Sequence, residues 1–256
     1  PDMTREESLE ATKIHSIMGL IPPSMGLLTT RPFRSPHHTA SAVALVGGGS
    51  IPKPGEVTLA HNGVLFLDEL PEFNRDVLEA LRQPLEDNYV TVSRAAKTLR
   101  FPSQVVLIAT MNPCNCGFFG VVGRNCHCSS HQIHKYISKI SGPLLDRIDL
   151  HLDVPMLPPN ELLSNKTAES SQDIKARTTK TRDIQKERFK NMPIFCNAQM
   201  SHRLTKHYCS ITPESRKLLS LAIKELSLSA RAYDKILKVS RTIADLEGTD
   251  EILVGH

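Results

Sequence analysis

The segment VLFLDEL at residues 64–70 constrains this chain most, because it joins an apolar run to two adjacent carboxylates. Residues 64–67 are short, continuous and apolar, which is typical of a strand buried on both faces of a parallel sheet. Asp68 and Glu69 follow at its C-terminal end, where open α/β sheets bind their ligands. Such a pair can hold Mg²⁺ on the phosphates of a nucleotide and polarise a water molecule. The alternative is an ordinary acidic turn after a strand.

Length and composition are those of a soluble globular protein. The 256 residues, 40% hydrophobic and 23% charged, have room for one large domain or for a core with a smaller lid. We expect no membrane span, because no segment approaches 18 uninterrupted apolar residues. The polar start PDMTREESLE is not a signal peptide and lacks an initiator Met, which suggests a fragment of a longer protein. Six cysteines without a secretory signal favour the reducing cytoplasm.

The hydrophobic pattern changes along the chain from that of strands to that of helices. We expect an α/β core over residues 1–155, a linker rich in Pro, Asn and Ser over 156–172, and an all-helical lid over 173–256. Thr4 and Glu7 have the spacing of a capping box, which predicts a helix over residues 4–18. The further elements expected are strands at 64–68, 105–110 and 148–154, a hairpin at 89–101, and helices at 74–82, 213–226 and 229–246.

The stretch from Lys175 to Arg188 carries six basic residues against two acidic ones. With Ile174, Ile184 and Phe189 it is typical of a basic amphipathic helix. Its basic face is either simply solvated or binds a polyanion, and the sequence leaves both readings open.

Each of the three expected core strands has a different polar residue at or near one end. Asp68 and Glu69 follow the first, Asn112 follows the second, and Arg147 precedes the third. A nucleotide-hydrolysing site needs such a set: a metal-holding carboxylate, a water-activating acid, an amide that orients the water, and a guanidinium for the developing charge. The alternatives are a turn residue at Asn112 and a salt bridge of Arg147 with Asp146 or Asp149.

Long phrases of the chain resemble the Mg-chelatase-like AAA+ ATPases, and within them the ComM/YifB subfamily of bacterial competence proteins. They are RPFRSPHHTASAVALVGGG at 31–49, IPKPGEVTLAHNGVLFLDELPEF at 51–73, VVLIATMNPCNCG at 105–117, SGPLLDRIDLHLDVP at 141–155 and LSARAYDKILKVSRTIADL at 228–246. They occur in the family's order and cover most of the chain except residues 156–212. The resemblance implies a partial AAA+ core of the P-loop type, with a mostly parallel sheet and a small helical lid.

The resemblance also implies roles for individual residues. Asp68 and Glu69 would form the Walker B element, Asn112 would be sensor 1, Arg147 would be the arginine finger acting on a neighbouring subunit, and Arg231 would be the sensor 2 arginine. The cofactors would be ATP and Mg²⁺. Arg231 also fits an ordinary exposed residue at a helix start. The phrase PHHT at 36–39 belongs to the family, but the role of its histidines does not follow from the sequence.

The chain departs from the family at the phosphate-binding loop. A P-loop holds phosphates with backbone amides and the lysine of Gly-Lys-Ser/Thr, and this sequence contains no Gly-Lys dipeptide. The family places that loop, and a further N-terminal domain, before the segment where this sequence begins. We therefore expect the chain alone neither to bind ATP tightly nor to hydrolyse it. Without the P-loop strand, neighbouring strands would have exposed apolar edges.

A cysteine-rich insert over residues 113–130 follows sensor 1. Cys114, Cys116, Cys126 and Cys128 form two C-x-C pairs that could surround one tetrahedral Zn²⁺, although the spacing is tighter than the usual two residues. The alternative is four reduced thiols, and three histidines nearby could substitute as ligands: His127, His131 and His134. The sequence leaves both readings open.

The expected hairpin carries Arg94, Lys97 and Arg100 at or near its tip. Basic residues there can grip the phosphates of a DNA strand, and related AAA+ motors use a hairpin at this place on DNA. The alternative is a solvated turn. The favoured function is an ATP-driven hexameric motor on single-stranded or branched DNA, a helicase for branch migration in natural transformation and recombination. The alternatives are a chelatase-type ATPase that remodels a protein partner for metal insertion, and a non-catalytic interaction module.

Overall fold

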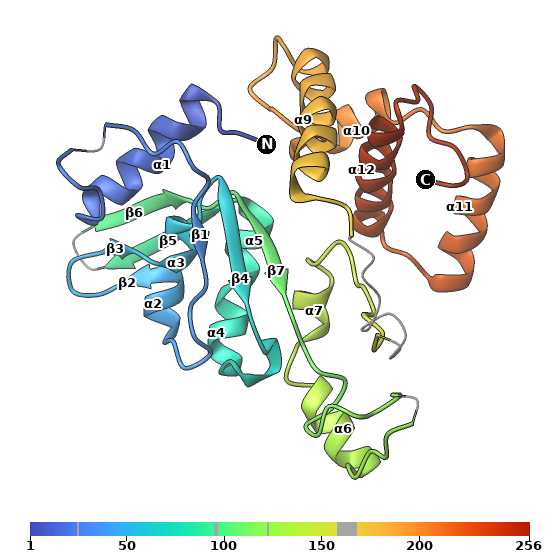
Figure 1. Cartoon of the computed structure of the whole chain (residues 1–256), viewed down its shortest axis with the longest axis horizontal. Coiled ribbons are helices and arrows are strands. Elements are labelled where there is room, and N and C mark those ends of the chain that lie inside the picture. The colour runs from blue at the N-terminus through green and yellow to red at the C-terminus, as the bar shows by residue number, and fades with distance from the viewer. Residues whose placement is uncertain (25, 95–96, 122, 158–167) are drawn as a thin grey trace. The chain divides into compact units, whose positions relative to one another are not determined.

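The computed structural model describes residues 1–24, 26–94, 97–121, 123–157 and 168–256 (Figure 1). The chain divides into two compact units, Asp2–Leu157 and Pro158–His256, which are described separately. The first is an α/β unit with a parallel sheet and the second is helical, as expected for a partial AAA+ core with a lid. Among the described helices, none is both long and apolar enough to cross a membrane.

The first unit is built around a three-stranded parallel sheet in the order β1-β4-β7 (Figure 1). Its strands are β1 (Phe33–Arg34), β4 (Gly63–Leu67) and β7 (Val105–Ala109), and a hairpin joins β5 (Tyr89–Arg94) to β6 (Lys97–Pro102), with β2 (Gly47–Gly48) paired to β3 (Lys53–Pro54). The helical elements are α1 (Arg5–Ile17), α2 (Ala42–Val46), α3 (Glu56–Leu59), η1 (Leu70–Glu72), α4 (Arg75–Ala80), α5 (Arg82–Asp87), α6 (Ser130–Ile137) and α7 (Gly142–Leu145).

Local chemistry accounts for several of these boundaries. The capping box of Thr4 and Glu7 is formed at the start of α1, which confirms that prediction. The helix expected at 74–82 is instead interrupted between α4 and α5. Pro84 has no N–H to donate to the carbonyl of Ala80, so a continuous helix would lack that hydrogen bond.

The strand predicted at 64–67 is present, but it is buried on only one face. Leu65 and Leu67 are fully buried in a core that also contains Leu45, Val77, Leu78 and Leu144 from α2, α4 and α7. Val64 and Phe66, on the other face, are partly exposed, as are Val106 and Ile108 of β7. The prediction of burial on both faces is therefore wrong, because the described helices that contribute to this core cover one face of the sheet.

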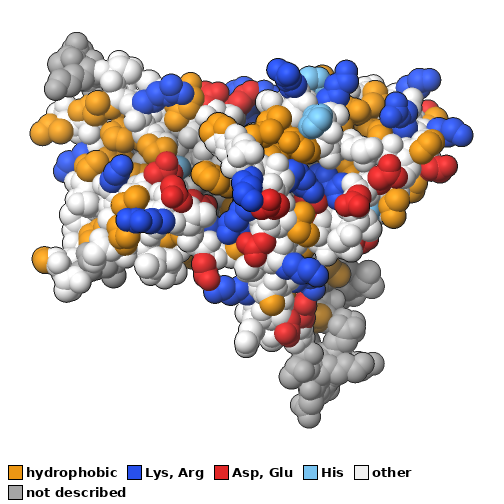
Figure 2. Space-filling model, turned by 90° about the horizontal axis from the view of Figure 1, so that it is seen from above, with side chains coloured by type: hydrophobic (Ala, Val, Ile, Leu, Met, Phe, Trp, Pro, Cys, Tyr) orange, Lys and Arg blue, Asp and Glu red, His pale blue; other side chains and the backbone are white. Residues whose placement is uncertain are grey.

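The prediction of a strand at residues 148–154 is also wrong. Residues 148–154 form no strand, and Leu150, Leu152 and Val154 are 61%, 82% and 90% exposed. Alternation of apolar and polar residues makes a strand only when a neighbouring strand supplies hydrogen bonds. Within the described residues the sheet ends at β7, and no strand pairs with this segment. Apolar side chains are also visible among the charged ones on the face drawn in Figure 2.

The second unit is helical. Its elements are α9 (Ser171–Arg188), η2 (Asn197–Gln199), α10 (His202–Tyr208), α11 (Pro213–Leu226) and α12 (Ala230–Glu247), which confirms the two C-terminal helices expected from the sequence. The core contains Phe189, Met200, Leu237 and Ala244. The basic helix at 175–188 is present as part of α9, but its buried side chains before Phe189 are Thr181 and Gln185, and Ile174 is 42% exposed. The prediction of an apolar face on this helix is therefore mostly wrong.

Buried charges join the first and last helices of this unit. The Asp245 carboxylate, 1% exposed, accepts hydrogen bonds from Arg188 at 2.5 and 2.7 Å, from Arg241 Nε at 3.1 Å and from Asn197 Nδ2 at 2.8 Å. Arg241 is equally buried and donates to the carbonyls of Thr249 and Asp250. Burial opposes charge on Asp245, but the hydrogen bonds from Arg188 and Asn197 outweigh it and lower the pKa of Asp245.

Candidate functional site

The acidic pair lies at an edge where two parallel strands end together. β4 and β7 are in register, with Leu67 opposite Ala109, so the residues that follow them are neighbours. The Thr110 hydroxyl donates to Oδ1 of Asp68, and the Thr110 amide donates to the Leu67 carbonyl at 3.0 Å. The sequence singled out the end of the second strand but did not assign Thr110 a role. Its hydroxyl nonetheless fixes the position of the Asp68 carboxylate.

Glu69 occupies an unusual backbone conformation at the same turn. Its φ of 53° lies in the left-handed region, which is uncommon for a residue with a side chain. Its amide donates to Oδ1 of Asp68 and to Oγ1 of Thr110, both at 3.2 Å, and these bonds hold the turn. The Glu69 side chain is 53% exposed. The turn therefore presents two carboxylates to solvent, Asp68 held by hydrogen bonds and Glu69 accessible beside it.

The PHHT phrase lies next to this turn. Nδ1 of His38 is 3.6 Å from a carboxylate oxygen of Glu69, and the ring of His38 lies edge-on to Phe73 at 6.4 Å. The His37 and His38 rings are 4.0 Å apart. The sequence did not reveal that His38 lies beside Glu69, because the two residues are far apart in the chain. The only indication was that the phrase belongs to the family that supplied the Walker B assignment.

Asn112 is exposed shortly after β7. Tyr136 of α6, which is only 4% exposed, lies near it. Burial and the charge of Glu72 raise the pKa of the Tyr136 hydroxyl, and the backbone of Asn112 partly opposes this rise. The segment that carries Asn112 therefore lies beside α6.

Arg147 follows α7 and is held inside its own chain. Its side chain is 13% exposed and forms an ion pair with Glu86 of α5. The guanidinium also donates to the carbonyl of Arg82 at 3.1 Å and to that of Pro143 at 2.5 Å. The ion pair that the structure gives Arg147 is with Glu86, a partner that the sequence did not suggest when it offered Asp146 or Asp149.

Two predicted groups lie outside this turn. Arg231 is exposed as the second residue of α12, in the helical unit. In the hairpin, Arg94 pairs with Lys97 at the end of the ladder, and residues 95–96 of the tip lie outside the described residues, as do the side chains of Arg94 and Lys97. The Arg100 guanidinium lies 3.3 Å from the centre of the Tyr89 ring.

The four cysteines of the insert converge. The sulfur atoms of Cys114, Cys116, Cys126 and Cys128 all lie within 4.8 Å of one another. Backbone N–H groups of Phe118 and His127 lower the pKa of Cys116 to about 6. At Cys126 the N–H of Cys128 favours the thiolate, but burial and the sulfurs of Cys116 and Cys114 outweigh it and raise the pKa to about 12. Four sulfurs this close cannot all be charged without a cation between them.

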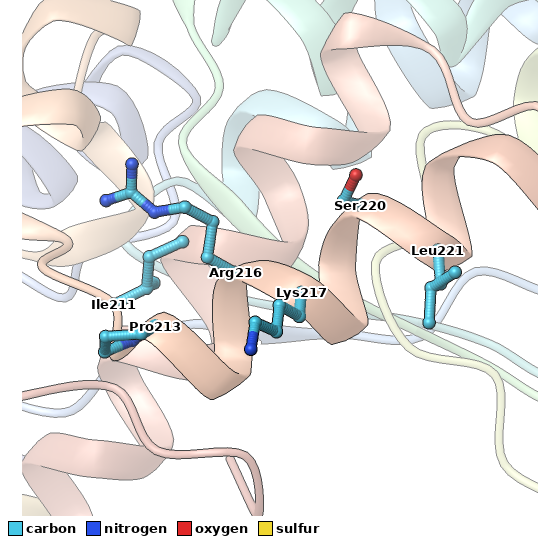
Figure 3. A pocket seen from close by; sticks show the side chains of 6 residues that line it. All are labelled: Ile211, Pro213, Arg216, Lys217, Ser220 and Leu221. Carbon is cyan, nitrogen blue, oxygen red and sulfur yellow. The ribbon is translucent and has the colours of Figure 1, made fainter.

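A cavity on the helical unit does not involve any of these groups. It is lined by a residue before α11 and by residues along that helix, where Arg216 and Lys217 extend in different directions (Figure 3). Its other lining residues are Ile211, Pro213, Ser220 and Leu221. The lining is mainly apolar and contains no carboxylate, so we do not assign it to nucleotide chemistry.

The comparisons with known proteins agree with the residue-level picture. The family model for magnesium chelatase, subunit ChlI, matches residues 1–162, and the model for the C-terminal part of that subunit matches residues 168–256. Over its full length the chain is 44% identical to the competence protein ComM of Haemophilus influenzae, and 42% and 41% identical to the YifB proteins of Escherichia coli and Salmonella typhimurium. It spans about half, 49%, of the length of each of these relatives. The chain belongs to the magnesium chelatase subunit ChlI family.

Proposed function

We propose that the full-length protein is an ATPase that uses the turn after β4 to hydrolyse ATP and to drive movement on DNA. The observation that carries this proposal is the arrangement of Asp68, fixed by Thr110 and the Glu69 amide at the joined ends of two parallel strands, with the Glu69 carboxylate exposed beside it. A carboxylate held in this way at a sheet edge is the usual protein contribution to an Mg²⁺–nucleotide site.

The donor set fits ATP with Mg²⁺. Mg²⁺ takes one or two protein carboxylates and completes its shell with water and phosphate oxygens, and Asp68 offers an exposed carboxylate of this kind. When bound, the metal ion neutralises phosphate charge. Asp68 would hold it, Glu69 would accept a proton from water, and Asn112 would orient that water. Arg231 would act as sensor 2 of the lid.

Arg147 is proposed as the arginine finger that acts on a neighbouring subunit, which makes the functional protein a homo-oligomer, by family resemblance a hexamer. A guanidinium supplied in trans stabilises the charge of the transition state. In the present conformation its partners are Glu86 and two carbonyls of its own chain. Its transfer to a nucleotide would therefore require exchange of these bonds when subunits meet.

DNA as the partner is supported by charge. Residues 88–145 contain no Asp or Glu, whereas the whole chain has 27 acidic residues. The same stretch carries six Lys and Arg residues: Arg94, Lys97 and Arg100 in the hairpin, Arg124 in the insert, and Lys135 and Lys139 in and after α6. Such a stretch favours a polyanion over an acidic protein partner.

The biological setting is part of the same proposal. The name of the Haemophilus influenzae relative connects that protein with competence. We extend this connection to the present family member as a cytoplasmic helicase for branch migration in natural transformation and recombination. The 256-residue chain alone would not hydrolyse ATP, because it contains no Gly-Lys of a phosphate-binding loop.

The experiment that tests the proposal is steady-state ATP hydrolysis by the full-length protein, with and without single-stranded and branched DNA. We expect DNA to raise the rate at least several-fold and ATP to drive strand displacement. Hydrolysis that is unaffected by DNA, but is raised by a protein partner, would favour the chelatase-type alternative. If the full-length protein hydrolysed ATP under no condition, the non-catalytic interaction module would be the remaining hypothesis.

A further inference from the structure

The cysteine insert has the spacing of a metal centre. The sulfur of Cys114 lies 3.4 Å from that of Cys116 and 3.7 Å from that of Cys126, and the sulfurs of Cys116 and Cys126 are 3.6 Å apart. In a tetrahedral site with Zn–S bonds of about 2.3 Å, the sulfur atoms are about 3.8 Å apart. A disulfide would require about 2.05 Å. The observed distances therefore fit four ligands of one ion and are too long for disulfides.

The backbone of the insert is shaped to bring the sulfurs together. Gly117 and Gly123 have φ values of 79° and 78°, which residues with side chains rarely adopt, and they reverse the chain between the two C-x-C pairs. The Gly117 amide donates to the Cys114 carbonyl at 3.0 Å. The C-x-C spacing, with one intervening residue instead of the usual two, is thus accommodated by local turns.

The histidines considered as substitutes are not needed, because the set of four cysteines is complete within the described residues.

The large aromatic side chains of the insert are not buried in a core. Phe118 and Phe119 are 37% and 49% exposed, and Phe118 lies under the Arg124 guanidinium, 5.6 Å from its ring centre. Small segments that cannot bury enough apolar surface are commonly stabilised by a bound metal, whose binding energy then becomes folding energy.

We infer that Cys114, Cys116, Cys126 and Cys128 bind one structural Zn²⁺ as thiolates. The ion joins the end of β7 to the start of α6, because Cys114 follows Asn112 by two residues and Cys128 precedes Ser129, the N-cap of α6. Because Cys114 is only two residues from Asn112, the ion also fixes the position of Asn112. Only this last consequence rests on the proposed ATPase function; the metal site itself does not.

The test is metal analysis of the full-length protein purified without chelator. We expect about one zinc per chain, and a Co²⁺-substituted protein with the thiolate-to-metal charge-transfer bands of a tetrahedral tetrathiolate site. The double variant Cys114→Ser/Cys126→Ser should lose the metal and these bands. Cys196→Ser, a cysteine outside the cluster, should retain both.

Thiol reactivity gives a second readout on the unsubstituted protein, in case the double variant fails to fold. Alkylation should spare four thiols until a strong chelator removes the zinc, and stepwise modification should release one zinc for four thiols. Less than about 0.2 zinc per chain after reconstitution, zinc retained by a folded double variant, or an iron–sulfur spectrum would each overturn the inference. None of these readouts depends on ATP or DNA, so failure of the metal site and failure of the proposed function are distinguishable.

Discussion

The Thr110 hydroxyl donates a hydrogen bond to Oδ1 of Asp68 across the ends of two paired parallel strands. The two residues are 42 positions apart in sequence, and the register of β4 with β7 brings them together. This bond orients the carboxylate that we assign to Mg²⁺.

Thr110→Val in the full-length protein should therefore weaken Mg²⁺-dependent ATP hydrolysis. Loss of a hydrogen bond to a charged group costs about 1.5–3 kcal/mol, which corresponds to a roughly ten- to hundred-fold lower kcat/KM. The measurement is the ATP hydrolysis rate as a function of Mg²⁺ concentration. Thr110→Ser, which keeps the hydroxyl, should remain within about three-fold of the wild type if a hydrogen bond is the cause. A Val variant as active as the Ser variant would exclude this role.

Mixing of two inactive variants tests whether Arg147 acts between subunits. Glu69→Gln and Arg147→Ala should each be inactive alone. A mixture should recover part of the activity, because an intact Glu69 of one subunit can face an intact Arg147 of another. Absence of recovery in mixed rings, verified by native mass spectrometry, would place Arg147 in a structural role with Glu86.

Glu86→Ala serves as the control for that ion pair. Its side chain is 36% exposed, so the pair with Arg147 should contribute no more than about 1 kcal/mol to folding. We expect ATP hydrolysis to be maintained, since Arg147 is then free to change partners. A loss of hydrolysis equal to that of Arg147→Ala would show that the intrachain bond itself is required.

The hairpin should contribute phosphate contacts. Arg94→Ala/Lys97→Ala in the full-length protein should weaken binding of single-stranded DNA. The negative slope of log K against log salt should become shallower by about 1.4, because each of the two lost phosphate contacts contributes about 0.7. Lys53→Ala, an exposed lysine in β3, should leave the slope unchanged. The measurement is fluorescence anisotropy over a range of salt concentrations. Equal slopes for the double variant and the wild type would argue against contact between the hairpin and DNA.

The buried carboxylate of Asp245 should dominate the acid sensitivity of the helical unit. Its lowered pKa means that its contribution to folding is fully present above the ordinary Asp value of about 3.9 and is lost as pH falls through the lower, folded-state value. Asp245→Asn should destabilise the unit by about 3–5 kcal/mol near neutral pH, because Arg188 and Arg241 lose their charged partner. Urea denaturation between pH 3 and 7 measures both effects.

Asp183→Asn is the matched control in that experiment. Its carboxylate is 62% exposed and pairs with Lys186 one turn away, so its substitution should change stability by less than about 1 kcal/mol. If Asp245→Asn and Asp183→Asn gave the same stability at every pH, the buried network would have no special role.

Local signals predicted much of the fold. The capping box of Thr4 and Glu7, the apolar run before Asp68 and the period of residues 213–226 depend on neighbours in sequence, and α1, β4 and α11 formed as predicted. Features that depend on distant partners were missed. The alternation at 148–154 predicted a strand, but a strand also needs a neighbour, and the described sheet ends at β7.

The same distinction applies to the site. Asp68, Glu69 and Asn112 were predicted as site residues because they follow apolar strands. The position of His38 beside Glu69 and the bond of Arg147 to Glu86 could not be predicted, because each joins segments that are remote in sequence. The four cysteines were visible from their spacing, but only the folded loop shows that their sulfurs converge.

The most direct test of the proposed hydrolytic centre is the Glu69→Gln variant of the full-length protein. Hydrolysis should fall by at least about a hundred-fold, the usual scale for loss of a general base, while Mg²⁺–ATP affinity stays within about three-fold. Glu72→Gln, a nearby carboxylate that pairs with Lys139, should hydrolyse ATP at the wild-type rate. Hydrolysis by Glu69→Gln within two-fold of the wild type would contradict the assignment of the turn after β4 as the catalytic site.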